Sequence, residues 1–194
     1  MNTVKVRNIE IGSGVPKICV PIVGVTKDEI IAEAKTFDSI PVDVVEWRVD
    51  WFEDVFDTDK VLDVAKDLQT VLKDTPILFT FRTAKEGGEK AISNETYKAL
   101  NMAVAKSGYV DLIDVEAFTG EEIVKSMIQE AHSYGVKVIA SNHDFDATPE
   151  KYEIVRRLRM MQDYGADIPK MAVMPRNKQD VLTLLSATLE MSEQ

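Results

Sequence analysis

Short β-rich runs alternate with segments of helical period along almost the whole chain, and this alternation limits the fold more than any other feature. Such an order is typical of βα units and predicts a parallel sheet covered by helices. An alternating N-terminal strand and a Gly12-Ser13-Gly14 turn precede six of these units. We expect the six strands at residues 17–23, 42–48, 77–82, 112–116, 137–143 and 168–174, each followed by a helix.

Six βα units fit two architectures, an open doubly wound sheet or most of a (β/α)8 barrel. The length of 194 residues favours the open sheet, because a complete barrel usually needs about 250 residues. Capping boxes are expected at Thr26 with Glu29 and at Thr119 with Glu122. In the last helix we expect an apolar stripe against the sheet, formed by Val181, Leu184, Leu185 and Thr188.

The composition predicts one globular domain, residues 1–194, with 45% hydrophobic and 29% charged residues. A net charge of -10 argues against nucleic-acid or membrane partners, because both are anionic surfaces that would repel it. A small anionic substrate stays compatible if local arginines bind it. The single cysteine, Cys19, falls in an expected buried strand and cannot form an internal disulfide. With no apolar leader and no run near 18 apolar residues, we expect a cytoplasmic location.

Charged residues recur near the ends of successive strands, where both architectures place their active sites. Alternate residues of a strand share a face, so each strand presents one set to the same side of the sheet. An open sheet would bury these groups under apolar helices, whereas a barrel points them into one axial pocket. We therefore predict an α/β fold of the (β/α)8 TIM-barrel family, with a site formed by Glu46, Arg48, Arg82, Glu116, His143 and Lys170.

Lys170 stands out because it lies in the apolar run 168–174, where a buried ammonium group would be costly. One interpretation is a buried salt bridge to Glu116 or Asp114. The other is a neutral amine that attacks a carbonyl and forms a Schiff base. A free lysine amine is neutral in only about one molecule in 2,500 at pH 7, so this second role needs desolvation and nearby cations.

The other candidates also have a structural and a functional interpretation. His143, at a strand end, is either a hydrogen-bonded structural imidazole or a general acid and base. Arg48 and Arg82 either balance glutamates in an ionic layer or bind a substrate carboxylate or hydroxyls. The loop at 83–89 carries Glu86, and we expect it to be a mobile flap. It does not match a P-loop, because no Gly-Lys-Ser/Thr follows its glycines. Two histidines and one cysteine at unrelated spacings predict no metal site.

Four segments carry a more specific signal than any single residue. They are 46–50 (EWRVD), 79–88 (FTFRTAKEGG), 141–145 (SNHDF) and 168–175 (IPKMAVMP). In this order and spacing they closely resemble type I 3-dehydroquinate dehydratase of the shikimate pathway. The resemblance covers the whole chain and implies a (β/α)8 barrel with an N-terminal hairpin across its base. It also implies the dehydration of 3-dehydroquinate to 3-dehydroshikimate through a lysine imine.

The resemblance assigns roles to the candidate residues. Lys170 matches the imine-forming lysine. His143 matches the acid and base that removes the C2 proton and protonates the departing C1 hydroxyl, and Glu86 matches the carboxylate paired with it. The residues that match groups holding the substrate's ring hydroxyls are Glu46, Arg48 and Arg82. Since a protonated imine itself stabilises the carbanion or enamine at C2, no metal or organic cofactor is expected.

Two departures from the family pattern bear on these expectations. Pro21 stands where some members carry a serine at the end of the first strand. Members also continue through two further βα units, which supply an arginine for the substrate carboxylate and a serine and glutamine on a lid loop. If 194 residues are the whole polypeptide, we expect weak or no activity, and a homodimer or other association through uncovered edges. The alternatives are another Schiff-base barrel lyase resembling a class I aldolase, and a non-catalytic fragment with partial substrate binding.

Overall fold

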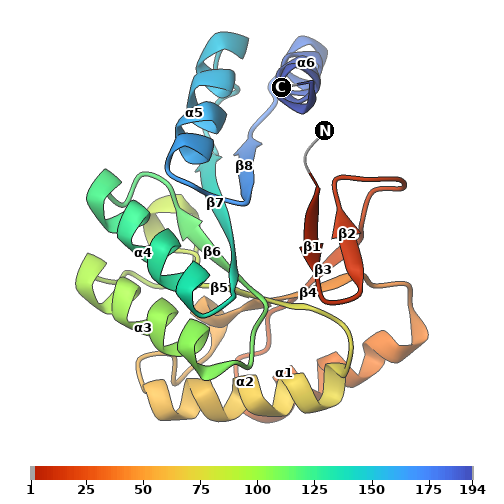
Figure 1. Cartoon of the computed structure of the whole chain (residues 1–194), viewed down its shortest axis with the longest axis vertical. Helices are drawn as coiled ribbons and strands as arrows, with labels where there is room; N and C mark the ends of the chain where they lie inside the picture. The colour runs from red at the N-terminus through yellow and green to blue at the C-terminus, as the bar shows by residue number, and fades with distance from the viewer. Residues whose placement is uncertain (1–2, 194) are drawn as a thin grey trace.

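A curled parallel sheet is the centre of the molecule. The computed structural model describes residues 3–193, and within this range the sheet has six strands in the order β3-β4-β5-β6-β7-β8. All neighbouring pairs are parallel. Figure 1 shows the sheet curling as part of a barrel, which confirms the prediction of six βα units. The strands are β3 (Cys19–Ile22), β4 (Val44–Arg48), β5 (Ile77–Thr80), β6 (Leu112–Glu116), β7 (Lys137–Asp144) and β8 (Ile168–Val173).

A helix follows each strand, and α1 to α5 lie on the outer side of the curled sheet (Figure 1). The capping box of Thr26 and Glu29 is confirmed. The one expected at Thr119 is wrong, because α4 is capped by Gly120 and has no side-chain cap. The helices are α1 (Lys27–Thr36), α2 (Thr58–Leu72), α3 (Asn94–Ser107), α4 (Glu121–Ser133), α5 (Lys151–Asp163) and α6 (Lys178–Ser192), with 3-10 turns η1 (Phe37–Ser39), η2 (Val49–Trp51) and η3 (Ala84–Glu86).

The main core lies between the outer face of the sheet and the helices. Alternate strand residues such as Trp47, Phe79 and Ile113 are fully buried there. Burying a large apolar side chain contributes roughly 1.5–3 kcal/mol. Because a slip of one residue would turn each of these side chains to the opposite face, the core also fixes which residues point inward.

An N-terminal hairpin closes the lower end of the inner face. Its strands, β1 (Val4–Val6) and β2 (Ile9–Ile11), pair antiparallel. Val6 packs in an apolar cluster with the first inward-facing residues of three strands, Val44, Leu78 and Leu112. The expected hairpin across the base is therefore present, and it leaves the carboxyl ends of the strands as the open end of the half-barrel.

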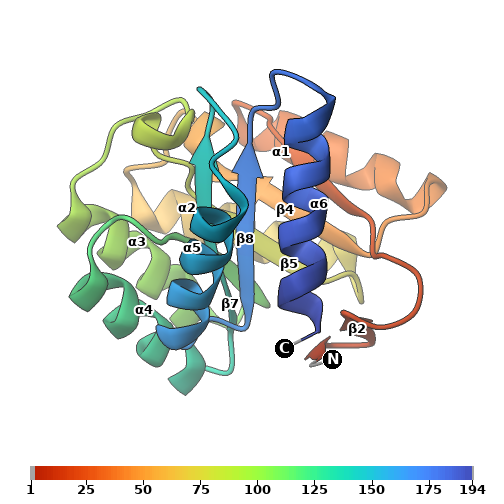
Figure 2. The ribbon, with the colours of Figure 1, turned by 90° about the horizontal axis from the view of Figure 1, so that it is seen from above.

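The edges of the sheet differ from the sequence expectations. Cys19 is exposed and not buried, because β3 is an edge strand with a neighbour on one side only. Helix α6 packs beside α5 (Figure 2), with Leu184 and Ala187 in the contact. The expected α6 stripe is partly wrong, since Val181 and Leu185 are exposed where no element of the described chain covers them. No helix within residues 3–193 is long and apolar enough to cross a bilayer.

Candidate active site

The inner face of the sheet changes from apolar to polar toward the carboxyl ends of the strands. Above the hairpin cluster, Thr80 Oγ1 donates to Glu46 Oε1 at 2.8 Å and Ser141 Oγ donates to Asp114 Oδ1 at 2.6 Å. Each bond joins two neighbouring strands, β4 with β5 and β6 with β7, so the predicted sets do share one face. The half-barrel therefore presents a polar layer at the end where barrel enzymes place their sites.

Arg82 lies at the centre of a buried ionic cluster. Its Nη2 donates to Asp114 Oδ1 at 2.8 Å, and its Nη1 donates to Glu116 Oε1 and Ser141 Oγ, both at 3.0 Å. Its side chain is 4% exposed. Burial lowers the pKa of Arg82, but the two carboxylates outweigh burial, and the pKa lies above its ordinary value. Arg82 is thus a fixed cation in an ionic layer. This agrees with the first of the two interpretations of Arg82 that the sequence allowed.

The two carboxylates bound to Arg82 differ in their environments. Burial raises the pKa of Glu116 above its ordinary value, although Thr83 donates to it from its backbone N at 2.8 Å and its Oγ1 at 2.7 Å. Burial also raises the pKa of Asp114, but the charges of Arg82 and Lys170 outweigh it and hold that pKa below its ordinary value. Asp114 is therefore ionised at neutral pH.

Lys170 extends from the edge strand β8 toward Asp114. Its Nζ lies 4.0 Å from Asp114 Oδ2, and its side chain is 39% exposed. The expectation of a buried lysine is therefore wrong, because no strand of the described residues lies beyond β8 to cover it. The amine is accessible to a ligand from the open side while it faces a buried carboxylate.

His143, at the end of β7, is held by Glu86. Glu86 Oε2 accepts from the backbone N of His143 at 3.0 Å and interacts with Nδ1 at 2.9 Å. The other oxygen accepts from Asn142 Nδ2 at 3.1 Å, and Arg157 Nη1 donates to Asn142 Oδ1 at 2.9 Å. With Nδ1 as the donor to Glu86, Nε2 is left to accept a proton.

The loop that carries Glu86 is anchored at several points in this structure. Glu86 itself is buried. Lys90 Nζ donates to the backbone oxygens of Asp50 and Phe52, at 2.7 and 2.9 Å. A Cβ on Gly88 would collide with the backbone of Arg82. The loop therefore fixes the carboxylate of Glu86 against β7.

Glu46 and Arg48 lie together on β4, at the rim of the ionic cluster. Arg48 Nε and Nη2 each donate to a different oxygen of Asp50 at 2.9 Å. These bonds raise the pKa of Arg48. Asp50 is fully buried and also accepts from the backbone N of Arg82 and of Glu89. Arg48 thus has a fixed orientation, with part of its side chain open to the half-barrel.

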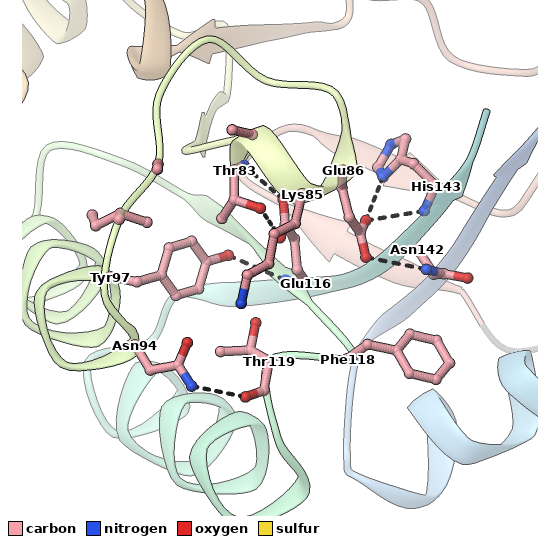
Figure 3. A pocket seen from close by; sticks show the side chains of 13 residues that line it. Thr83, Lys85, Glu86, Asn94, Tyr97, Glu116, Phe118, Thr119, Asn142 and His143 are labelled. Atoms are coloured by element: carbon pink, nitrogen blue, oxygen red, sulfur yellow. Dashed lines mark hydrogen bonds and ion pairs between the residues drawn. The ribbon is translucent and has the colours of Figure 1, made fainter. Parts of the chain in front are cut away.

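A cavity of about 320 Å³ adjoins the catalytic candidates on the side of the Glu86 loop. Figure 3 shows Glu86, Asn142 and His143 along one side of it and Tyr97, Asn94 and Thr119 along the other. Lys170 does not line this cavity. Within the described residues, no group of three His, Cys, Asp or Glu side chains could hold a metal ion.

Sequence reasoning missed three residues that build the site. Asp50 was present in the EWRVD segment, yet its position after the strand gave no sign that it orients Arg48. Asn142 points away from the inner face in strand parity, and it reaches Glu86 only because the loop folds over β7. Arg157 lies on α5, 15 residues after Asn142, where no sequence pattern links the two.

Comparison with known proteins identifies the family. The family model described as type I 3-dehydroquinase matches residues 18–194. The chain belongs to the type I 3-dehydroquinase family. Within the family, it is 55% identical to 3-dehydroquinate dehydratase of Listeria monocytogenes serotype 4a (strain HCC23), over 193 residues that are 100% of this chain and 77% of the relative.

Solved structures of this family share the fold. A type I 3-dehydroquinate dehydratase from Clostridium difficile, with covalently modified comenic acid, has a TM-score of 0.96 and 53% identity, over 98% of this chain and 75% of that one. The 3-dehydroquinate dehydratase of Enterococcus faecalis has a TM-score of 0.94 and 48% identity, over 97% and 78%. The chain therefore spans about three quarters of these relatives, and its curled sheet is that of their barrel.

Proposed function

We propose that this chain catalyses the dehydration of 3-dehydroquinate to 3-dehydroshikimate, with Lys170 as the imine-forming lysine. The reaction makes it a carbon–oxygen lyase of the shikimate pathway. The observation that supports the residue roles best is the Glu86–His143 pair, which places an oriented imidazole at the end of the strand next to the one that carries Lys170. The covalently modified ligand in the Clostridium difficile relative also supports a nucleophile in the family site.

The proposed chemistry needs only these side chains. Lys170 Nζ forms a bond to the C3 carbonyl carbon, the oxygen leaves as water, and an iminium remains. His143 takes the C2 proton while the C–H electron pair moves toward the iminium nitrogen. The pair then returns and expels the C1 hydroxyl, which leaves as water with a proton from His143. Hydrolysis of the imine restores the lysine, and no metal or organic cofactor takes part.

The substrate's ring hydroxyls are proposed to bind Glu46, Arg48 and Arg82. Glu46 uses one carboxylate oxygen for Thr80, so the second can accept from a hydroxyl. Arg48 lies at the open rim with its orientation fixed by Asp50. Arg82 is buried, so its proposed part is the smallest of the three and is combined with holding the carboxylates in place.

Reductive trapping tests this proposal. Borohydride added with 3-dehydroquinate should leave a ligand adduct on the peptide that carries Lys170, detected by mass spectrometry. Lys170→Ala should lose the adduct, while Lys151→Ala should keep it, because Lys151 lies on α5 and pairs with Glu190. The absence of adduct in the unmodified protein would rule the imine out.

A direct assay separates this function from the alternatives. Turnover should produce the conjugated enone carboxylate, seen as a rise in ultraviolet absorbance, whereas an imine-forming aldolase would cleave a carbon–carbon bond. A binding protein without catalysis would show heat of binding in calorimetry and no absorbance change.

Self-association, as a homodimer, is part of the proposal. Helix α6 exposes Val181, Leu182, Leu185 and Leu189, and the sheet edges β3 and β8 each lack one neighbour within residues 3–193. Such apolar surface favours association. Sedimentation should show a dimer, and Leu185→Lys should shift it toward monomer.

We also propose that the chain is a single barrel domain of a cytoplasmic protein that binds a small molecule. Its net charge of -10 argues against nucleic-acid and membrane partners, because both carry negative charge. At low salt, we expect the protein to bind neither to immobilised DNA nor to anionic vesicles.

A further inference from the structure

The two oxygens of the Asp114 carboxylate are used differently. Oδ1 accepts from Arg82 Nη2 at 2.8 Å and from Ser141 Oγ at 2.6 Å. Oδ2 is buried and has no hydrogen-bond partner among the described residues. The structure gives Oδ2 one ion pair within residues 3–193, to Lys170 Nζ at 4.0 Å. An unpaired buried carboxylate oxygen is destabilising, so it calls for an explanation beyond the fold.

We propose that Asp114 is the counter-ion of Lys170, facing the cation both as the free ammonium and as the iminium formed with substrate. The inference rests on the imine of the proposed function and adds a residue to it. At 4.0 Å the nitrogen is just beyond hydrogen-bond distance.

The role follows from where charge is needed. The iminium must stay protonated to draw the electron pair from C2, and a fixed carboxylate beside it favours that state. Arg82 and Ser141 hold Oδ1, so Asp114 does not have to reorient during the reaction. Asp114 exchanges no proton: the ammonium first loses one to solvent, the C–N bond forms, and the iminium nitrogen keeps a single hydrogen.

The groups around this pair come from several elements. The Tyr97 hydroxyl of α3 donates to the backbone oxygen of Asp114 at 3.2 Å, and burial raises the pKa of Tyr97 so that it stays neutral. The remaining charged or titratable groups facing Asp114 or Lys170 are Arg82 after β5, Glu116 on β6, His143 on β7, and Cys19 on β3 with the adjacent Glu46 on β4.

Asp114→Asn tests the proposal with little change of shape. The rate of adduct formation, trapped with cyanoborohydride, is measured against pH. Without the carboxylate the cation is less favoured, so the pH of half-maximal rate should fall, and turnover at pH 7 should fall about tenfold or more. The matched control is Glu116→Gln, which removes a carboxylate bound to the same arginine and should move that pH much less.

An unchanged half-maximal pH in folded Asp114→Asn overturns the proposal. Wild-type protein that forms no adduct defeats the imine itself, which is a separate failure of the proposed function. If Asp114→Asn does not fold, or no adduct forms, the stability of Lys170→Met tests the ion pair between the Lys170 ammonium and Asp114. This substitution should lower the urea midpoint at pH 7, because Asp114 loses its partner, and an unchanged midpoint overturns the pairing.

Discussion

A single oxygen of Glu86 binds His143 twice, through the backbone N at 3.0 Å and the ring Nδ1 at 2.9 Å. Because both contacts belong to one residue, the ring is fixed relative to the backbone of β7 and not only to a side chain. Glu86 thus fixes the orientation of the proposed base.

His143→Ala should lower turnover by roughly 10²- to 10⁴-fold, the usual contribution of a general acid and base. The adduct on Lys170 should still form, since imine formation needs the amine first. Turnover is followed by the enone absorbance and the adduct by mass spectrometry. His132→Ala is the control, because His132 pairs with Asp167 at the end of α4, away from the site. Turnover that survives in His143→Ala would exclude the proton-transfer role.

Arg157→Met should lower kcat by about 3- to 10-fold, less than the 10²-fold that full misplacement of a catalytic group costs. Arg157 donates to Asn142, and Asn142 donates to the second oxygen of Glu86. The loss of Arg157 should therefore weaken the positioning of His143 indirectly, through Asn142 and Glu86. Arg156→Met is the matched control: Arg156 shares Glu153 with Arg157 but has no bond to Asn142. Equal kcat values for the two variants would contradict a positioning role for Arg157.

The features that follow from the two-residue alternation of side chains along a strand could be predicted from the sequence. Strand parity placed Glu46, Asp114 and Lys170 on one face, because alternation along a strand is fixed by backbone geometry. It did not predict the exposure of Lys170, since burial at an edge strand depends on which strand lies beside it. Nor did it predict that Arg82 would be shared by two carboxylates, because such bonds depend on distances between strands.

Gly88→Ala should reduce kcat strongly, by roughly tenfold or more, because its Cβ would collide with the Arg82 backbone and displace the loop that carries Glu86. Gly108→Ala is the control. Gly108 has φ +75° and open space around its Cβ position, so the substitution should cost about 1–2 kcal/mol in stability and leave kcat unchanged. Steady-state kinetics and thermal unfolding separate the two effects. A Gly88→Ala enzyme with normal kcat would show that the loop can shift without moving Glu86.

Arg82→Met should destabilise the protein by about 3–5 kcal/mol at pH 7, because it leaves Asp114 and Glu116 buried without their cation. Urea unfolding between pH 7 and pH 3 measures the effect. The pKa of Asp114 in the folded protein lies below its ordinary value, so its stabilising contribution is present above the unfolded pKa of about 3.9 and is lost as pH falls through the folded pKa. The deficit of Arg82→Met should therefore shrink toward acid pH, where the carboxylates become protonated.

Arg48→Met is the matched control for the Arg82 prediction. Its carboxylate partner, Asp50, keeps backbone donors from Arg82 and Glu89 at 3.3 and 3.2 Å, so removal of the guanidinium leaves it partly satisfied. We expect a smaller loss, of roughly 1–3 kcal/mol. If both variants lost equal stability, with a deficit that did not change between pH 7 and pH 3, Arg82 would matter through packing and not as the cation that keeps Asp114 ionised.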